Sequence, residues 1–155
     1  MIWEEIKETL IFIETQTMDR FVLLEKMGYA MVQEGYGDAS YVKALTQRER
    51  IFPTGIVTRC GGVAIPHTDT AYVKKEGIAL AVAKQPIWFR RMESEKESIP
   101  VHLVLLLAVK DPNRHVRRLQ KLMELLQDTE AMRMVLSAET KQQVLCAVRK
   151  WEERT

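Results

Sequence analysis

Histidines are the first candidates for chemistry in this sequence, because an imidazole changes its charge near neutral pH. The chain has three of them. His67 comes directly after the apolar stretch Gly62–Pro66, and loops that follow buried strands are where α/β proteins carry reactive groups. From position alone, an ordinary hydrogen-bonded surface histidine is the commoner role. His102 lies inside the apolar run Val101–Val109, where we expect a core or edge-of-core histidine satisfied by one hydrogen bond.

His115 falls in the first turns of a helix that we expect to begin at Asp111-Pro112, an N-cap followed by proline at the first helical position. The positive end of a helix suits an anion such as phosphate. Basic residues including Arg117 and Arg118 follow on the same helix. For His115, a partly exposed position on the helix without a chemical role is the commoner case. For the basic residues, the commoner case is a face exposed to solvent. The alternative is a docking face for an acidic partner, or for a phosphoryl group that the partner carries.

Other reactive patterns are missing. The sequence has no His-Glu-x-x-His and no Cys-x-x-Cys, so we expect no metal. Gly61-Gly62 belongs to neither a dinucleotide-binding fingerprint nor a P-loop, and we expect no cofactor. Cys60 and Cys146 lack the signature of a catalytic thiol and are expected to be free thiols of a cytoplasmic protein.

Composition predicts one soluble globular domain over residues 1–155. Hydrophobic residues make up 46% of the chain and charged residues 28%, which is the usual balance of a soluble protein. A net charge of +2 gives no electrostatic footprint for nucleic acid. The acidic N-terminus does not resemble a secretory signal, and no apolar run approaches the roughly 20 residues that span a bilayer, so we expect no membrane insertion.

The apolar patterns predict alternating elements. Expected strands cover Leu10–Glu14, Gly62–Pro66, Gly77–Ala83, Ile87–Arg90 and Val101–Val109, the last of them central and covered on both faces. Expected helices run from about Met18 to Glu34, from Asp38 toward Pro53, and from Asp111, Asp128 and Ser137 onward. The charged segment Glu93–Ser98 is expected to be an exposed loop. This order favours a mixed sheet with helices on both faces.

Several strings then resemble one family. The ordered strings are Tyr41-Val-Lys-Ala-Leu-Thr-Gln-Arg-Glu49, Phe52-Pro-Thr-Gly-Ile56, Gly62-Val-Ala-Ile-Pro-His-Thr-Asp69, Pro86-Ile-Trp-Phe89 and Pro100-Val-His-Leu-Val104, followed by His115. From Leu10 to Val148 the chain resembles the enzyme IIA component of the sugar phosphotransferase system, of the mannitol/fructose type. The Pro53-Thr-Gly-Ile56 form is similar to the galactitol-type branch.

The resemblance implies a fold and a function. The fold would be a three-layer α/β/α sandwich around a central mixed sheet. The protein would take a phosphoryl group from the phosphocarrier HPr onto His67 and pass it to a cysteine of enzyme IIB, which serves the membrane enzyme IIC. His115 would be the second active-site histidine and Arg48 the family's arginine. Attack would come from Nε2 of His67 while an oxygen acceptor holds its Nδ1–H, and no metal is needed.

Two alternatives remain at this point. The first is a regulatory phosphoprotein of the same fold, as in the nitrogen-related branch, which would act by binding partners according to the phosphorylation of His67. The second is a metal-dependent hydrolase that uses His67 and Asp69, although too few ligands are evident for it.

Overall fold

The central strands are apolar on both faces because helices cover both faces of the sheet. The computed structural model describes residues 1–155. Its five-stranded sheet has the order β1-β4-β5-β3-β2. The strands are β1 (Ile6–Glu14), β2 (Gly55–Thr58), β3 (Gly61–Ala64), β4 (Gly77–Arg90) and β5 (Ser98–Ala108). β1 runs parallel to β4 and β3 parallel to β5, whereas the pairs β4–β5 and β2–β3 are antiparallel, so the sheet is mixed.

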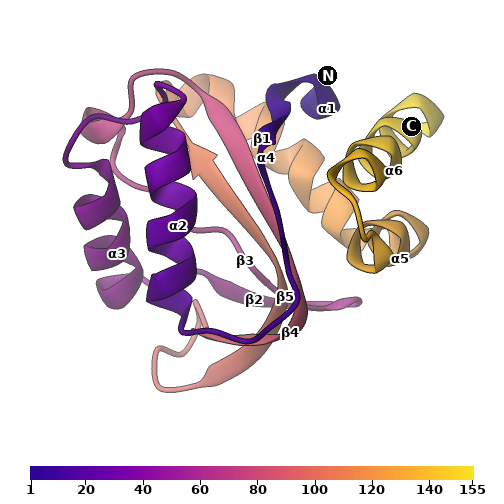
Figure 1. Ribbon diagram of the computed structural model, residues 1–155, viewed down its shortest axis with the longest axis horizontal. Helices are drawn as coiled ribbons and strands as arrows, with labels where there is room; N and C mark the ends of the chain where they lie inside the picture. Colours follow the sequence, from indigo (N-terminus) through magenta and orange to yellow (C-terminus); the bar gives the residue numbers. More distant parts are fainter.

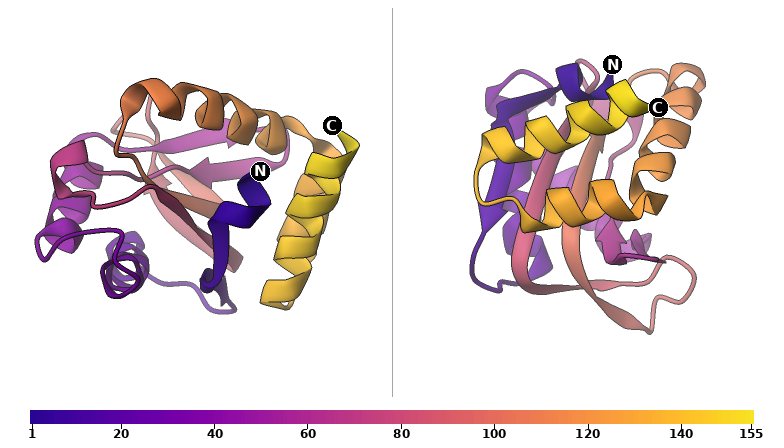
Figure 2. Two further views of the ribbon diagram at one scale, coloured as in Figure 1. Left: turned by 90° about the horizontal axis from the view of Figure 1, so that it is seen from above. Right: turned by 90° about the vertical axis from the view of Figure 1, so that its right-hand side faces the viewer.

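Helices form one layer on each side of this sheet (Figures 1 and 2). α2 (Arg20–Gln33) and α3 (Tyr41–Ile51) cover one face. The other face is covered by α1 (Ile2–Glu5), α4 (Pro112–Gln127), α5 (Thr129–Ser137) and α6 (Lys141–Arg154). Successive residues of β5 point to opposite layers, so Leu105 packs in one core cluster and Leu106 in the other. The expected three-layer α/β/α sandwich is confirmed.

The parallel pairing of β3 with β5 creates the edge at which the candidate residues meet. Chains that leave two neighbouring parallel strands emerge at the same edge of the sheet. The loop after β3 therefore lies beside the connection from β5 to α4, and the pairing extends to a bridge between His67 and Leu107. A short 3-10 turn, η1 (Thr70–Tyr72), follows in the β3 loop.

The Gly61-Gly62 pair serves this pairing. A side-chain carbon on Gly62 would lie 2.1 Å from the carbonyl oxygen of Pro100, so only glycine allows β3 to approach β5 this closely. Gly61 has a φ of +107°, in the region that favours glycine, where the chain turns between β2 and β3. The pair is a strand-pairing feature and not a ligand loop.

Several expected boundaries are confirmed. Asp111 caps α4 by accepting a hydrogen bond from the backbone N–H of Asn113, and Asp128 caps α5 through Ala131. β5 is central, as its unbroken apolar run indicates. The segment between β4 and β5 is an exposed connection, although Ser98 already begins β5.

Other expectations were wrong, for reasons of tertiary pairing. The two strands expected on either side of Pro86 are one strand, β4, because its pairing with β5 shifts register between Val82 and Ile87 and absorbs the proline. β1 begins at Ile6 instead of Leu10, because Ile6 pairs with Ile78.

The remaining differences concern helix starts and short elements. Ser137 ends α5, and the last helix is α6, which Thr140 opens through a capping box with Gln143. α3 begins after Ser40, whose N–H is bonded by the Asp38 side chain. Neither the edge strand β2 nor the four-residue helix α1 was expected.

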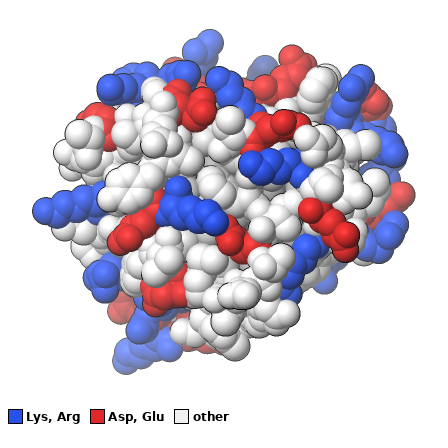
Figure 3. All heavy atoms as spheres, viewed as in Figure 1, with Lys and Arg blue, Asp and Glu red and all other residues white.

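Charged side chains are mixed over the face that Figure 3 shows, with lysines and arginines interspersed among acidic residues. This mixing agrees with the small net charge of +2. None of the helices combines the length and apolar character needed to cross a bilayer.

Candidate functional site

Three side chains from three different elements line one cavity of about 380 Å³. They are Arg48 from the last turn of α3, His67 from the loop after β3, and His115 from the first turns of α4. Apolar residues of β5 and α4, among them Leu107 and Leu119, form part of the wall. A larger hollow of about 960 Å³ lies where α4 and α6 meet, and no histidine or cysteine lines it. The smaller cavity is therefore the one in which two histidines and an arginine meet.

His67 is held by backbone groups on both sides. Its Nδ1 lies 3.0 Å from the carbonyl oxygen of Ile65. A carbonyl can only accept, so Nδ1 carries the proton and Nε2 keeps its lone pair. The carbonyl of Pro66 accepts a hydrogen bond from the backbone N–H of Leu107 at 3.0 Å, which fixes the loop to β5. In the neutral imidazole, the loop thus presents Nε2 with its lone pair free.

Arg48 is partly committed before any ligand enters. Its Nη1 donates to Oδ1 of Asp69 at 2.9 Å, and that aspartate is 71% exposed. The guanidinium carbon lies 5.2 Å from the centroid of the Phe52 ring, and the buried Nε makes no hydrogen bond within the protein. Because Arg48 has five N–H donors, the single bond to Asp69 leaves others for an anion.

His115 lies in a less polar setting than an ordinary surface histidine. Its Nδ1 is buried and makes no hydrogen bond within the protein. Burial lowers the pKa of His115, the nearby positive charge of Arg118 and the neighbouring His67 lower it further, and Glu76 opposes them. The ring is therefore neutral at physiological pH and can act as a hydrogen-bond donor or acceptor without carrying a full charge.

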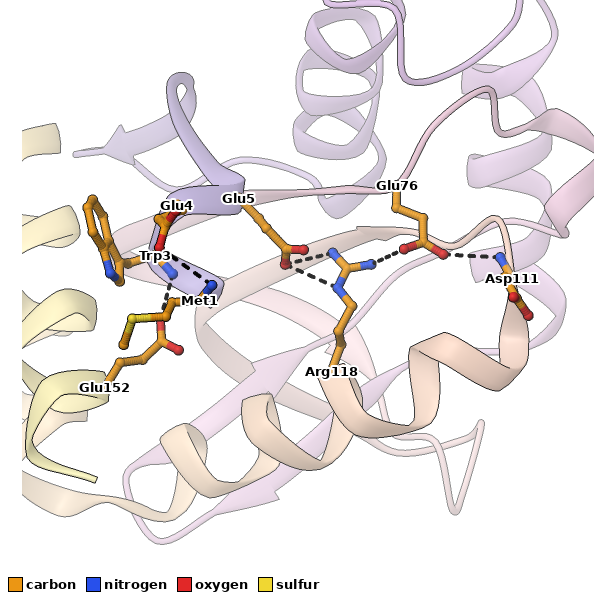
Figure 4. Close-up of polar contacts among 8 residues, drawn as sticks. All are labelled: Met1, Trp3, Glu4, Glu5, Glu76, Asp111, Arg118 and Glu152. Carbon is orange, nitrogen blue, oxygen red and sulfur yellow. Dashed lines mark hydrogen bonds and ion pairs between the residues drawn. The ribbon is translucent and has the colours of Figure 1, made fainter.

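A chain of ion pairs holds the start of α4 in place (Figure 4). Arg118 donates to Oε2 of Glu5 and to Oε2 of Glu76, each at 3.1 Å. The second oxygen of Glu76 accepts the backbone N–H of Asp111 at 3.2 Å. The N-terminal helix α1, the entry to β4 and the first turn of α4 are thereby joined, and the position of His115 depends on all three.

Glu49 is a buried carboxylate behind the site to which the sequence patterns assigned no role. It is 2% exposed, and both of its oxygens accept hydrogen bonds from Thr54, one from the backbone N–H at 2.8 Å and one from the hydroxyl at 2.7 Å. Burial raises the pKa of Glu49 to about 7, although the bonds from Thr54 and the charge of Arg20 lower it. Its only signal in the sequence is its place in the Arg48-Glu49 string, five residues before Thr54.

The other reactive side chains lie elsewhere. Nδ1 of His102 donates a hydrogen bond to the carbonyl oxygen of Ala83 at 2.8 Å, as expected of a histidine in the sheet, and His102 does not line the cavity. Cys60 is half-buried and Cys146 exposed; both are free thiols outside the cavity. No cluster of three or more His, Cys, Asp or Glu side chains is arranged to hold a metal, and Asp69 is paired with Arg48.

The titration of His115 should report its neighbours. We expect His115 to titrate below the reference value of about 6.5. Arg118→Gln should raise the pKa of His115 because it removes a neighbouring positive charge, and Glu76→Gln should lower it. NMR of the ring Cε1–Hε1 groups as a function of pH measures each histidine separately. Arg149→Gln on α6, which removes an exposed arginine, is the matched control and should leave His115 unchanged. A pKa that stays the same in Arg118→Gln would contradict this electrostatic account.

Glu49 should make stability fall with rising pH. Its folded-state pKa of about 7 lies above the ordinary glutamate value of 4.5, so the folded protein binds more protons than the unfolded chain between these values. The free energy of unfolding should therefore decrease as the pH rises through this window. Glu49→Gln cannot titrate and should lack this part of the decrease. Urea unfolding at several pH values gives the free energy of unfolding of both proteins. An equal decrease of this free energy with pH in the two proteins would refute the expectation.

The chain matches one protein family over nearly its whole length. The family model of the phosphoenolpyruvate-dependent sugar phosphotransferase system, EIIA 2, matches residues 4–151. The chain is 28% identical over 120 residues to the galactitol-specific EIIA component of Escherichia coli (strain K12), which covers 77% of this chain and 79% of that protein. It is 34% identical over 101 residues to the transcriptional regulator ManR of Bacillus subtilis, which covers 65% of this chain but only 14% of ManR.

The fold is also similar to solved structures. The complex of enzyme IIA-mannitol with phosphorylated enzyme IIB-mannitol from Escherichia coli contains a chain that aligns with a TM-score of 0.75 at 21% identity. The alignment covers 94% of this chain and 99% of that one. Since the family model spans nearly the whole sequence, the chain belongs to the EIIA 2 family of the phosphoenolpyruvate-dependent sugar phosphotransferase system.

Proposed function

We propose that this protein accepts a phosphoryl group from HPr on Nε2 of His67 and passes it to a cysteine of enzyme IIB during sugar uptake. The observation that carries the proposal is the bond from Nδ1 of His67 to the Ile65 carbonyl, which leaves Nε2 unprotonated. This nitrogen belongs to a histidine that lines the same cavity as Arg48 and His115. A neutral imidazole is a competent nucleophile at physiological pH.

The transfer needs no other reactant. The lone pair of Nε2 attacks phosphorus, and an N–P bond forms as the bond from phosphorus to its donor atom on HPr breaks. In the second step the thiolate sulfur of enzyme IIB attacks the same phosphorus, and the N–P bond breaks with its electrons returning to Nε2. Because little covalent chemistry falls to the protein, positioning and charge stabilisation account for the rate.

The other cavity residues would stabilise the transferring group. The donors of Arg48 not engaged by Asp69 can bind phosphoryl oxygens, and the dianion competes with the exposed Asp69 carboxylate for the rest. His115 can donate one hydrogen bond while neutral, and it lies near the positive end of α4. No metal is required for this charge balance.

The relatives also suggest which sugar class to test first. The galactitol-specific EIIA of Escherichia coli aligns over 79% of its length, and the Pro53-Thr-Gly-Ile56 string is similar to that branch. We therefore propose a galactitol-type IIB and IIC as first candidates, with mannitol-type and fructose-type proteins as the comparison.

A regulatory role is the second candidate, and the name of one relative favours it. A segment of the transcriptional regulator ManR is 34% identical to this chain. In that role the phosphorylation of His67 would alter the binding of partners, and the phosphoryl group would not be passed on to a sugar. Transfer of label from the phosphorylated protein to a IIB cysteine would support the transport role, whereas a phosphoryl group that no IIB accepts would support the regulatory one.

His67 should be the phosphoryl acceptor. Incubation with phosphoenolpyruvate, enzyme I and HPr should raise the intact mass by one phosphoryl group, in an acid-labile adduct. His67→Ala should remove the adduct because no other side chain in the cavity presents a nitrogen held in this way. His102→Gln, which alters a histidine outside the cavity, is the control and should still be labelled. Stoichiometric labelling of the His67→Ala variant would refute the assignment.

Arg48 and His115 should support transfer without accepting the group. Loss of one donor that stabilises a developing charge typically slows a reaction by about 10²–10³-fold. Arg48→Ala should have the larger effect because its charge is permanent, and His115→Ala the smaller one. Rapid-quench measurements of transfer to and from His67 give the rates once circular dichroism has shown both variants folded. Wild-type rates in both directions for both variants would remove these residues from the mechanism.

A further inference from the structure

We propose that Glu49 is a positioning residue which, through Thr54, fixes the loop of His67 and the helix end of Arg48 relative to each other. This inference rests on the proposed function only for the consequence in phosphoryl transfer. Its structural content concerns the orientation and the tautomer of His67, and these can be measured without any phosphoryl donor.

The first step is a pair of hydrogen bonds between Glu49 and Thr54, which we call the grip. Glu49 sits at the C-terminal end of α3 and Thr54 one residue before β2, and both are almost fully buried, at 2% and 3% exposure. The carboxylate accepts from the N–H and from the hydroxyl of the same residue, Thr54. Two hydrogen bonds between this one pair of residues fix the distance between Glu49 and Thr54. They also fix the orientation of the turn that joins the two residues.

The second step links the position of Thr54 to that of His67. The carbonyl of Thr54 accepts a hydrogen bond from the backbone N–H of Ile65 at 3.4 Å, and β2 pairs with β3 from Gly55 onward. The carbonyl of Ile65 is the group that holds Nδ1 of His67 at 3.0 Å. Hydrogen bonds thus run without a gap from the Glu49 carboxylate to the imidazole ring.

Arg48 is governed by the same grip because it precedes Glu49 on α3. Its carbonyl accepts the N–H of Phe52 at 2.6 Å, which closes the helix just before the turn that Glu49 holds. A change in this turn would shift both the guanidinium and the imidazole. The Arg48-Glu49 and Pro53-Thr54 strings of the sequence therefore form one structural unit, which is joined by the bonds between Glu49 and Thr54.

Both protonation states of Glu49 can maintain this arrangement. The ionised form accepts two hydrogen bonds from Thr54, and the neutral form can accept one and donate one, because the Thr54 hydroxyl can rotate. Arg20 is the charged group that acts on Glu49 here, and Arg50 and Arg90 act on Arg20 in turn. Glutamine has the shape and the hydrogen-bonding pattern of the neutral acid and should substitute for it.

Loss of the grip should appear first in the imidazole. If the Ile65 carbonyl moves, the Nδ1–H tautomer loses its acceptor and the Nε2–H tautomer gains population. That tautomer has no lone pair on Nε2 for attack on phosphorus. Displacement of a reacting group by about 1 Å can cost on the order of 100-fold in rate.

The test uses four variants and one matched control in the full-length protein. Glu49→Ala removes both bonds between Glu49 and Thr54, and Thr54→Val removes the one from the hydroxyl, whereas Glu49→Gln and Thr54→Ser preserve both. Glu152→Ala is the control, because Glu152 is a second buried carboxylate, 5% exposed, which holds the backbone N–H of Trp3 on the far helical layer. Long-range ¹H–¹⁵N spectra at a pH where histidine is neutral give the tautomer of His67, and phosphoryl uptake from phosphorylated HPr gives kcat and KM.

We expect a single Nδ1–H tautomer in the wild type, in both conservative variants and in Glu152→Ala. Glu49→Ala and Thr54→Val should show mixed tautomers and a kcat lowered about 10-fold to 100-fold, with an unchanged KM for HPr.

A folded Glu49→Ala or Thr54→Val protein whose His67 tautomer matches the wild type would overturn the proposal. If Glu49→Ala does not fold, Thr54→Val decides the question, since valine has nearly the volume of threonine and only replaces the hydroxyl with a methyl group. A wild-type protein that takes no phosphoryl group from HPr would refute the proposed function, while the tautomer measurement would still decide the role of Glu49.

Discussion

The close parallel pairing of β3 with β5 is the constraint on which the site depends. It brings the loop that carries His67 against the strand that leads into the helix of His115. The pairing requires Gly62, because any side chain there would collide with the Pro100 carbonyl. It is extended past the end of β3 by the bond between the Pro66 carbonyl and the Leu107 N–H. His67, the proposed phosphoryl acceptor, is therefore fixed to the central strand β5, although it lies in a loop.

Charge compensation is the second feature of the site. Arg118 is only 15% exposed and is paired with two carboxylates, so its charge serves to hold the start of α4. Arg48 is paired with a single, highly exposed carboxylate. An exposed pair of this kind contributes little to stability, because solvent screens it. Arg48 could therefore bind a phosphoryl dianion with little loss of stability. Arg118, in contrast, would stay paired with its two carboxylates and hold the start of α4.

Local signals in the sequence predicted much of the fold. Asp111-Pro112 and Asp128 are helix starts in the structure, because an N-cap depends on a few neighbouring residues. The unbroken apolar run through Leu105 predicted a central strand for the same reason of local composition. Elements that depend on partners were missed: β2 exists as an edge strand only because it pairs with β3, and the proline in β4 is tolerated only because a register shift absorbs it.

The sequence by itself determined the family and the identity of three candidate residues, His67, His115 and Arg48, since their strings are short and ordered along the chain. Only the tertiary structure decided that these three line one cavity, that the Ile65 carbonyl holds the ring of His67, and that Glu49 lies behind them. The reason is physical. A hydrogen bond to a backbone carbonyl leaves no mark on residue types, and burial of a carboxylate depends on strands and helices that the chain brings together only on folding.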